Sequence, residues 1–210
     1  MADGNLLLSF RHLNQVMKID RVTGDVIWRL GGKRSDFAFD DDPWGGPCAQ
    51  HTARELANGE IQIFDNGSAS GPAPSNPLCP DPLNPGGDPV YRPHSRVTVY
   101  DLDPTTNLDP KAHLVRSSAV GAFSQFAGSA QRLGENTLAD HLFLGLNNAE
   151  QLTPPVYGGD DAPDAVELAA DGSVVWTLTA PGYATYRAAK LDVPDLVQTV
   201  RGVGYRLATG

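Results

Sequence analysis

Thr23-Gly24-Asp25-Val26-Ile27-Trp28-Arg29-Leu30 is the stretch that decides the fold. Thr, Gly and Asp form turns, and the β-branched and aromatic residues after them favour a strand over residues 26–30. Before the turn, residues 15–20 alternate polar with apolar side chains, and residues 5–10 form a short apolar run. These segments predict a meander of three antiparallel strands.

The same pattern returns along the chain. Asp171-Gly172-Ser173-Val174-Val175-Trp176 echoes residues 23–28, and residues 96–103 and 164–168 take the place of the strand at 15–20. Residues 52–64 and 129–137 each indicate a strand, a turn and a second strand. Stretches near 67–93, 104–110 and 149–163 are typical of insertions between strands.

Repeated units of this kind predict an all-β fold. We expect a partial β-propeller of about three four-stranded blades, of which the first lacks its opening strand. A β-sandwich would give a similar number of strands and stays an alternative. No segment predicts a helix of normal length, although residues 183–200 are ambiguous.

Composition narrows the possible partners. The chain has 210 residues and a formal net charge of −9, which disfavours binding to nucleic acid or to an anionic membrane surface. No apolar run approaches the roughly 20 residues that cross a bilayer, and residues 1–5 lack the features of a secretory signal peptide. We therefore expect a soluble chain, and its localisation stays open.

Cys48 and Cys79 are the two cysteines. They are candidates for a disulfide in an oxidising compartment, and two free buried thiols are the alternative. Together with His51 and His94 they also form a possible zinc set, but the wide spacing of Cys79 and His94 in a Pro-rich loop gives it poor support. The chain has no P-loop sequence for a nucleotide donor, and we expect neither a cofactor nor a metal.

His51 is the histidine best placed for chemistry. It stands at the start of a predicted strand, where the inner strands of propellers project side chains toward the central channel. A single histidine is more often a hydrogen-bonded structural residue than a nucleophile. The remaining histidines are interpreted as structural: His12, His94, His113 and His141.

Three groups of residues resemble the arylsulfotransferase family over about residues 3–190. The first runs from Leu8-Ser9-Phe10-Arg11 through Lys18-Ile19-Asp20-Arg21 to the stretch 23–32; the second is Gln50-His51-Thr52-Ala53; the third is Phe64-Asp65-Asn66-Gly67 with Ser95-Arg96. The resemblance implies a six-bladed propeller that moves a sulfuryl group from a phenolic sulfate to another phenol. Small phenolic sulfates and phenols are then the expected partners.

The resemblance also implies roles for individual residues. His51 matches the histidine that carries the sulfuryl group as sulfohistidine, and Arg11 matches the sulfuryl-binding arginine. The substrate-binding candidates are Arg96, Asn66, Gln50 and Ser129. A surface salt bridge is the alternative for Arg96 and an ordinary turn for Asn66, whereas Ser129 would substitute for a threonine of the family.

The chain also departs from the family pattern. The family's His-x-Asn element and the earlier half of its propeller, with another active-site histidine, would fall ahead of Met1. We therefore expect the C-terminal portion of the family fold, with another copy or an N-terminal half completing the ring. A non-catalytic binding module or a truncated, inactive product is the alternative function, because an incomplete ring leaves sheet edges unpaired. Family members are commonly exported.

Residues 191–210 form a tail of uncertain origin after the propeller-like residues 1–190. Within it, Thr199-Val200-Arg201-Gly202-Val203-Gly204-Tyr205-Arg206-Leu207 resembles the last hairpin of the winged-helix domain in two-component response regulators. Nothing upstream supplies a recognition helix, and the acidic composition argues against DNA binding. We interpret the segment as an unrelated strand or as the scar of a gene fusion.

Overall fold

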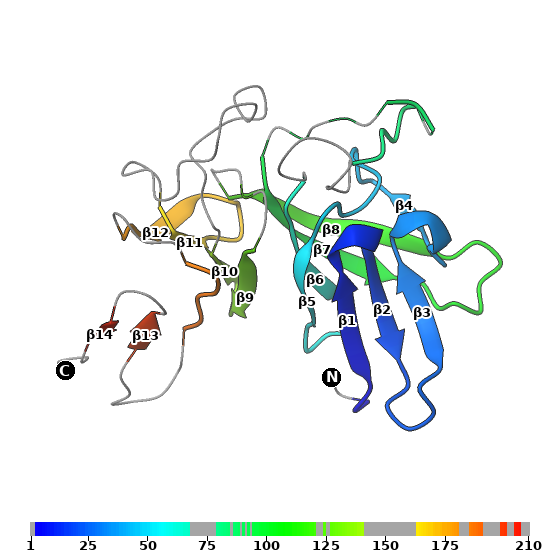
Figure 1. Ribbon diagram of the computed structural model, residues 1–210, viewed down its shortest axis with the longest axis horizontal. Coiled ribbons are helices and arrows are strands. Elements are labelled where there is room, and N and C mark those ends of the chain that lie inside the picture. Colours follow the sequence, from blue (N-terminus) through cyan, green and yellow to red (C-terminus); the bar gives the residue numbers. More distant parts are fainter. Residues whose placement is uncertain are drawn as a thin grey trace.

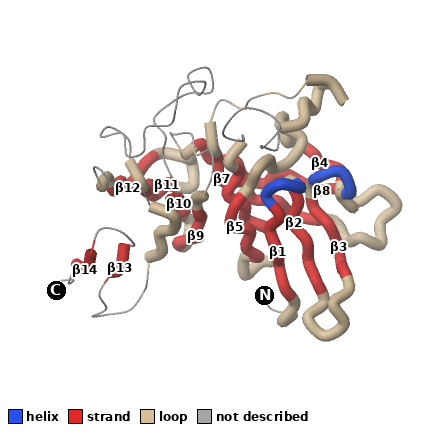
Figure 2. The backbone as a smooth tube through the Cα atoms, viewed as in Figure 1, coloured by secondary structure: helices blue, strands red, loops and turns tan. Residues whose placement is uncertain are grey.

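Strands and short turns make up the fold in the computed structural model (Figure 1, Figure 2). The structure describes residues 3–67, 79–84, 86–88, 90, 92, 94–120, 124, 127–140, 163–180, 185–190, 198–200 and 204–206. The helices within these residues are two single turns of 3-10 helix, η1 (Arg11–Leu13) and η2 (Gly32–Arg34). The prediction of an all-β fold is confirmed. No helix in the described ranges is long and apolar enough to span a membrane.

The first sheet is the meander that the opening stretch predicts. It contains β1 (Leu6–Phe10), β2 (Gln15–Ile19) and β3 (Val26–Leu30), antiparallel and in that order. The turn between β2 and β3 closes with a hydrogen bond from the Asp20 N–H to the Asp25 carbonyl. Turn chemistry and strand propensity therefore agree in this sheet.

The second sheet has five strands, two of which the sequence did not predict. Its order is β4 (Ala38–Asp40), β8 (Lys111–Ala119), β7 (Arg96–Leu102), β6 (Ile61–Asp65) and β5 (His51–Glu55). The missed strands are β4 and β8, which pair in parallel with each other. β8 carries Lys, His, Arg and Ser among its apolar residues, so its partner β7, rather than its own pattern, defines it.

The third sheet repeats the first. It contains β9 (Ser129–Leu133), β10 (Asn136–Asp140), β11 (Ala165–Leu168) and β12 (Val174–Leu178). Trp28 pairs with Lys18 beside a register shift in the first sheet, and Trp176 pairs with Glu167 beside the corresponding shift here. The repeat in the sequence is thus matched by a repeat in the backbone pairing. β13 (Gln198–Val200) and β14 (Gly204–Arg206) form a separate antiparallel hairpin within the tail.

The three sheets follow one another around their inner strands. β1 contacts β5, and β9 contacts both β5 and β6, while β3 and β12 lie at the outer ends of their sheets (Figure 1). One apolar core joins the first and second sheets, and another, around Phe64 and Val97, joins the second and third. The middle sheet is therefore covered on both faces, as a propeller blade is and a sheet of a two-layer sandwich is not. The number of blades and the boundary at residue 190 stay predictions.

The core between the first two sheets offers a test of this packing. Ile63 on β6 is fully buried, whereas Ile27 on β3 is 41% exposed. Because truncation of a buried isoleucine leaves a cavity, we expect Ile63→Ala to lower the free energy of unfolding by about 2–4 kcal/mol. Ile27→Ala is the matched control and should cost under about 1 kcal/mol. Urea denaturation measures both values, and equal losses would contradict the described packing.

Candidate active site

A tight turn brings Arg11 to the start of β5. Gly31 has φ 81°, and a Cβ atom there would lie 2.6 Å from the Asn14 carbonyl oxygen, so glycine lets the turn after β1 approach the end of β3. On the other side, the Gln50 side-chain amide donates to Ser9 Oγ and to the carbonyls of Phe10 and Gln15. Arg11 is the first residue of η1, in the turn that Gln50 holds through Phe10 and Gln15, and it is partly buried.

His51, the first residue of β5, has hydrogen-bond partners at both ring nitrogens. Its Nδ1 lies 2.8 Å from Asn66 Oδ1, and the backbone N–H of Ala127 donates to its Nε2 at 3.1 Å. Asn66 follows the end of β6 and Ala127 precedes β9, so two sheets fix one imidazole. The ring itself is only partly buried.

The backbone around His51 adopts unusual conformations. Ala49, Thr52 and Ala127 have φ of 53°, 33° and 62°, in the left-handed region that non-glycine residues rarely occupy. The register of β5 against β6 shifts between His51 and Ala53, so a bulge redirects the strand at this point. The Thr52 hydroxyl donates to the Gly128 carbonyl at 3.1 Å. Strained residues of this kind concentrate at functional sites.

The surroundings of His51 keep its imidazole neutral at ordinary pH. Burial lowers its pKa below the usual value of 6.5, and the positive charge of Arg11 adds to this effect. Hydrogen bonds to the Asn66 side chain and the Ala49 backbone oppose the shift without reversing it. The site therefore pairs an uncharged imidazole with a nearby cation.

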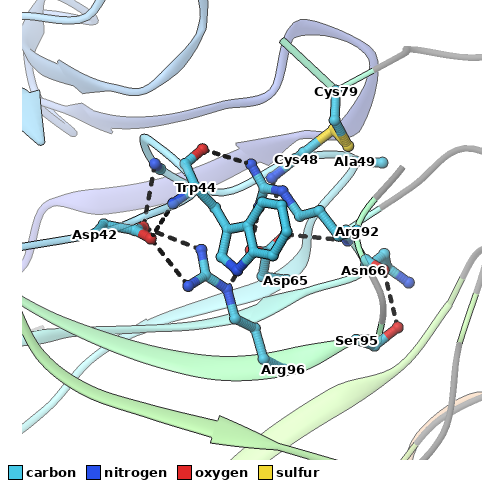
Figure 3. Close-up of polar contacts among 12 residues, drawn as sticks. Asp42, Trp44, Cys48, Ala49, Asp65, Asn66, Cys79, Arg92, Ser95 and Arg96 are labelled. Carbon is cyan, nitrogen blue, oxygen red and sulfur yellow. Dashed lines mark hydrogen bonds and ion pairs between the residues drawn. A yellow bond between two sulfur atoms is a disulfide. The ribbon is translucent and has the colours of Figure 1, made fainter. Parts of the chain in front are cut away.

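Asp65, next to Asn66 in the chain, is the centre of a buried ionic network (Figure 3). Its Oδ2 accepts from Arg92 at 2.6 Å and from Arg96 Nε at 2.9 Å. Its Oδ1 accepts from the backbone N–H of Cys48 at 2.8 Å and of Gly67 at 3.1 Å. One carboxylate thus joins the end of β6, strand β7 and two loops.

Asp42 extends the network to the loop before β5. Both its oxygens accept from Arg96, at 3.0 Å each, and the Tyr100 hydroxyl donates to Oδ2 at 2.6 Å. Burial alone would raise the pKa of Asp42, but these hydrogen bonds and the charge of Arg96 lower it. The carbonyl of Trp44, from the same loop, accepts from Arg92, whose guanidinium lies over the indole ring (Figure 3).

The structure separates the predicted site residues into two groups. His51, Asn66 and Arg11 lie close together. Gln50, Arg96 and Ser129 are almost fully buried and bind the protein itself, Ser129 through the Ala188 carbonyl. Arg96 lies neither in an open channel nor in a surface salt bridge, because two buried carboxylates occupy its guanidinium. The predicted turn at Asn66 is instead a buried contact.

Three of the other histidines lie within the described residues: His12, His94 and His113. His12 is exposed on η1, and its charge is a further, smaller influence that lowers the pKa of His51. His113 lies on β8, between β4 and β7, beside Asp40 and Asp103. Burial and the charge of Arg96 lower the pKa of His94. His141 lies outside the described residues.

Cys48 and Cys79 form a disulfide that ties the loop before β5 to the residues that precede β7. Because the two sulfur atoms bond to each other, neither is a thiolate for the zinc set considered above. Among the described residues, no group of three or more His, Cys, Asp or Glu is arranged to hold a metal ion.

Sequence reasoning missed several residues that build the site. Asp42, Asp65, Arg92 and the Ala127 N–H carry much of its geometry. Asp65 lies in the family-like motif Phe64-Asp65-Asn66-Gly67, but an aspartate before Asn-Gly is also typical of an ordinary turn. The only available signal was the number of charged residues beside apolar strands, which does not say which charges are paired.

The ionic network generates a prediction about stability. Asp65→Asn keeps the size of the side chain but removes the charge between Arg92 and Arg96, so two buried guanidinium groups lose their shared carboxylate. We expect a loss of about 3–5 kcal/mol in the free energy of unfolding. Asp109→Asn is the control, because it removes an exposed ion pair with Lys111 and should cost under about 1 kcal/mol. Similar losses in the two variants would overturn this assignment.

Comparison with known proteins agrees with the geometry. The family described as Arylsulfotransferase (ASST) matches residues 1–154, which include β1 to β10 and all the contacts of His51. A comparison with curated proteins found no match. Since the family match covers well over half of the sequence, the chain belongs to the arylsulfotransferase (ASST) family.

Proposed function

We propose that the chain transfers a sulfuryl group from an aryl sulfate to a phenol, with His51 as the covalent carrier. The observation that carries this proposal is a neutral, partly buried imidazole with two fixed hydrogen-bond partners and a cation nearby. Membership of the family supports the class of reaction. The identities of the carrier residue and of the two substrates go beyond this class of reaction and are the specific content of the proposal.

The reaction proceeds in two balanced steps. In the first, the lone pair of an imidazole nitrogen attacks sulfur, an N–S bond forms, and the S–O bond to the donor breaks with its electron pair leaving as phenolate. In the second, the acceptor oxygen attacks the same sulfur and the N–S bond breaks. The proton of the acceptor phenol passes through solvent to the released phenolate, so the enzyme returns to its starting state.

Arg11 has the charge that this chemistry requires. Negative charge develops on the sulfuryl oxygens and on the leaving phenolate, and a fixed cation stabilises both. The turn that carries Arg11 is held against β5 by Gln50, so the guanidinium requires little reorganisation during the reaction. We assign Arg11 to the sulfuryl group for this reason.

One observation favours a second candidate, a non-catalytic binding module. Leu6, Leu8 and Phe10 on β1 are 44%, 40% and 38% exposed, and among the described strands only β2 pairs with β1. Trp176 on β12 is 48% exposed, whereas its counterpart Trp28 is 9% exposed. Apolar surfaces of this kind commonly mark interaction sites. A folded chain that binds a phenolic sulfate without turning it over would favour this candidate.

The proposed carrier is tested by replacing His51. The full chain is incubated with 4-nitrophenyl sulfate and phenol, and the release of nitrophenolate is followed by absorbance. We expect His51→Gln to reduce turnover at least about 10³-fold, because a covalent nucleophile is lost. His113→Gln, on β8 beside the exposed Asp40, is the matched control and should keep wild-type activity. Turnover by folded His51→Gln at the wild-type rate would refute the proposal.

The pKa of His51 gives a second prediction. Attack requires the neutral ring, and its pKa lies below 6.5, so kcat/KM should hold down to pH 6.5 and fall only in more acidic solution. Arg11→Gln removes a positive charge that lowers this pKa, so the acid limb should move toward higher pH. The same variant should lose roughly 10²–10³-fold in kcat/KM. A pH profile with an unmoved acid limb would argue against the placement of Arg11.

A further inference from the structure

The side-chain amide of Asn66 can face its surroundings in only one way. Its Nδ2 lies 2.9 Å from the Ser124 carbonyl oxygen and 2.8 Å from the Ala127 carbonyl oxygen. Carbonyl oxygens only accept hydrogen bonds, so the NH₂ group must point at them. A flipped amide would set its oxygen against two other oxygens inside a fully buried environment. The amide oxygen therefore points at His51.

This orientation decides which nitrogen of His51 carries the proton. Asn66 Oδ1 only accepts, so Nδ1, 2.8 Å away, must be the donor. On the opposite edge, the Ala127 N–H only donates, so Nε2, 3.1 Å away, must offer a lone pair. Two contacts, one from the residue after β6 and one from the loop before β9, thus require the same tautomer.

We infer that Asn66 is a positioning residue that holds His51 as the Nδ1–H tautomer, and that Nε2 is therefore the atom that attacks sulfur. The first half concerns the resting protein alone, and the second half rests on the proposed function. When the Nε2–S bond forms, the ring becomes positively charged, and its Nδ1–H continues to donate to Asn66. The lone pair of Nε2 must leave the Ala127 N–H as the substrate arrives.

A neutral amide suits this role better than a carboxylate. A carboxylate beside Nδ1 would fix the same tautomer but would also raise the pKa of the ring. With an amide, the ring stays neutral and weakly basic. A weakly basic imidazole is the better leaving group when the acceptor displaces it from sulfur, so tautomer control without added charge keeps the lone pair free of a proton for the first step and favours the second.

The tautomer can be measured in the resting full chain without substrate. The protein is ¹⁵N-labelled at histidine, and the His51 signals are assigned by their absence from His51→Gln. In alkaline solution, where the ring is neutral, we expect a pyrrole-type signal for Nδ1 and a pyridine-type signal for Nε2. The opposite pattern, or averaged signals from both tautomers, would overturn the inference whether or not the chain is active.

Variants then test the role of Asn66. Asn66→Leu should lose the tautomer preference and reduce kcat roughly 10²-fold or more with a smaller change in KM, because the wrong tautomer has no lone pair at Nε2. Asn136→Leu, which removes a contact to Glu167 on the third sheet, is the matched control and should change neither. Asn66→Asp keeps an acceptor for Nδ1 and adds charge, so the pKa of His51 should rise in an NMR titration. An unchanged pKa would contradict the contact between Nδ1 and residue 66, and loss of the tautomer preference only in Asn66→Leu would separate positioning from a structural role.

The readouts also separate the two proposals. The expected tautomer in a chain without turnover would leave Asn66 as the positioning residue and refute the proposed function. His51-dependent turnover with the Nε2–H tautomer would support the proposed function and refute the role assigned to Asn66.

Discussion

The carboxylate of Asp65 is the constraint on which the site depends. It is fully buried and is shared by Arg92, Arg96 and the backbone of Cys48. Arg92 and Cys48 lie outside the sheets, so no backbone ladder fixes them, whereas Asp65 ends β6 and is fixed by its pairing with β7. Asp65 therefore joins these loops to the sheet, together with the Cys48–Cys79 disulfide and the contacts of Asp42. Removing the charge of Asp65 would leave the buried Arg92 without a carboxylate partner and Arg96 with Asp42 alone, in a medium of low dielectric constant.

Asp65 and Asn66 are neighbours in the chain, so fixing Asp65 also fixes the residue that contacts the His51 imidazole. Asp65 makes its contacts within the ionic network, and the next residue contacts His51. The Asn66 carbonyl also accepts from Ser95, the residue before β7. Each group in this series has a fixed partner on a second element, so the ring orientation is set before any substrate binds. In the proposed reaction this preorganisation limits the rearrangement to the contact between Nε2 and the Ala127 N–H, because the contact of Nδ1 with Asn66 is kept.

Local sequence signals predict much of the fold, and the limits have physical causes. The hairpins around Asn58-Gly59, Thr23-Gly24 and Asp171-Gly172 could be predicted because turn residues stand between apolar runs. β8 could not, because its Lys, His and Arg side chains give no clear alternation and its pairing depends on β7. Likewise, the motif around His51 predicted this residue as the candidate nucleophile, but the bond from the Ala127 N–H comes from a backbone atom, and no residue type encodes it.

Burial explains why some candidate residues lie at the site and others support it. A polar side chain that leaves water must find partners in the protein, since an unpaired buried polar group costs about 1–3 kcal/mol. Gln50, Arg96 and Ser129 are at most 2% exposed, and the Gln50 amide nitrogen, the Arg96 guanidinium and the Ser129 hydroxyl contact the protein, whereas Gln50 Oε1 is buried without a hydrogen-bond partner. His51 and Arg11 are only partly buried and keep surface toward solvent. The family motif contains both kinds of residue because the fully buried residues hold the partly buried ones in position. A motif residue's type alone does not tell these roles apart, whereas its degree of burial does.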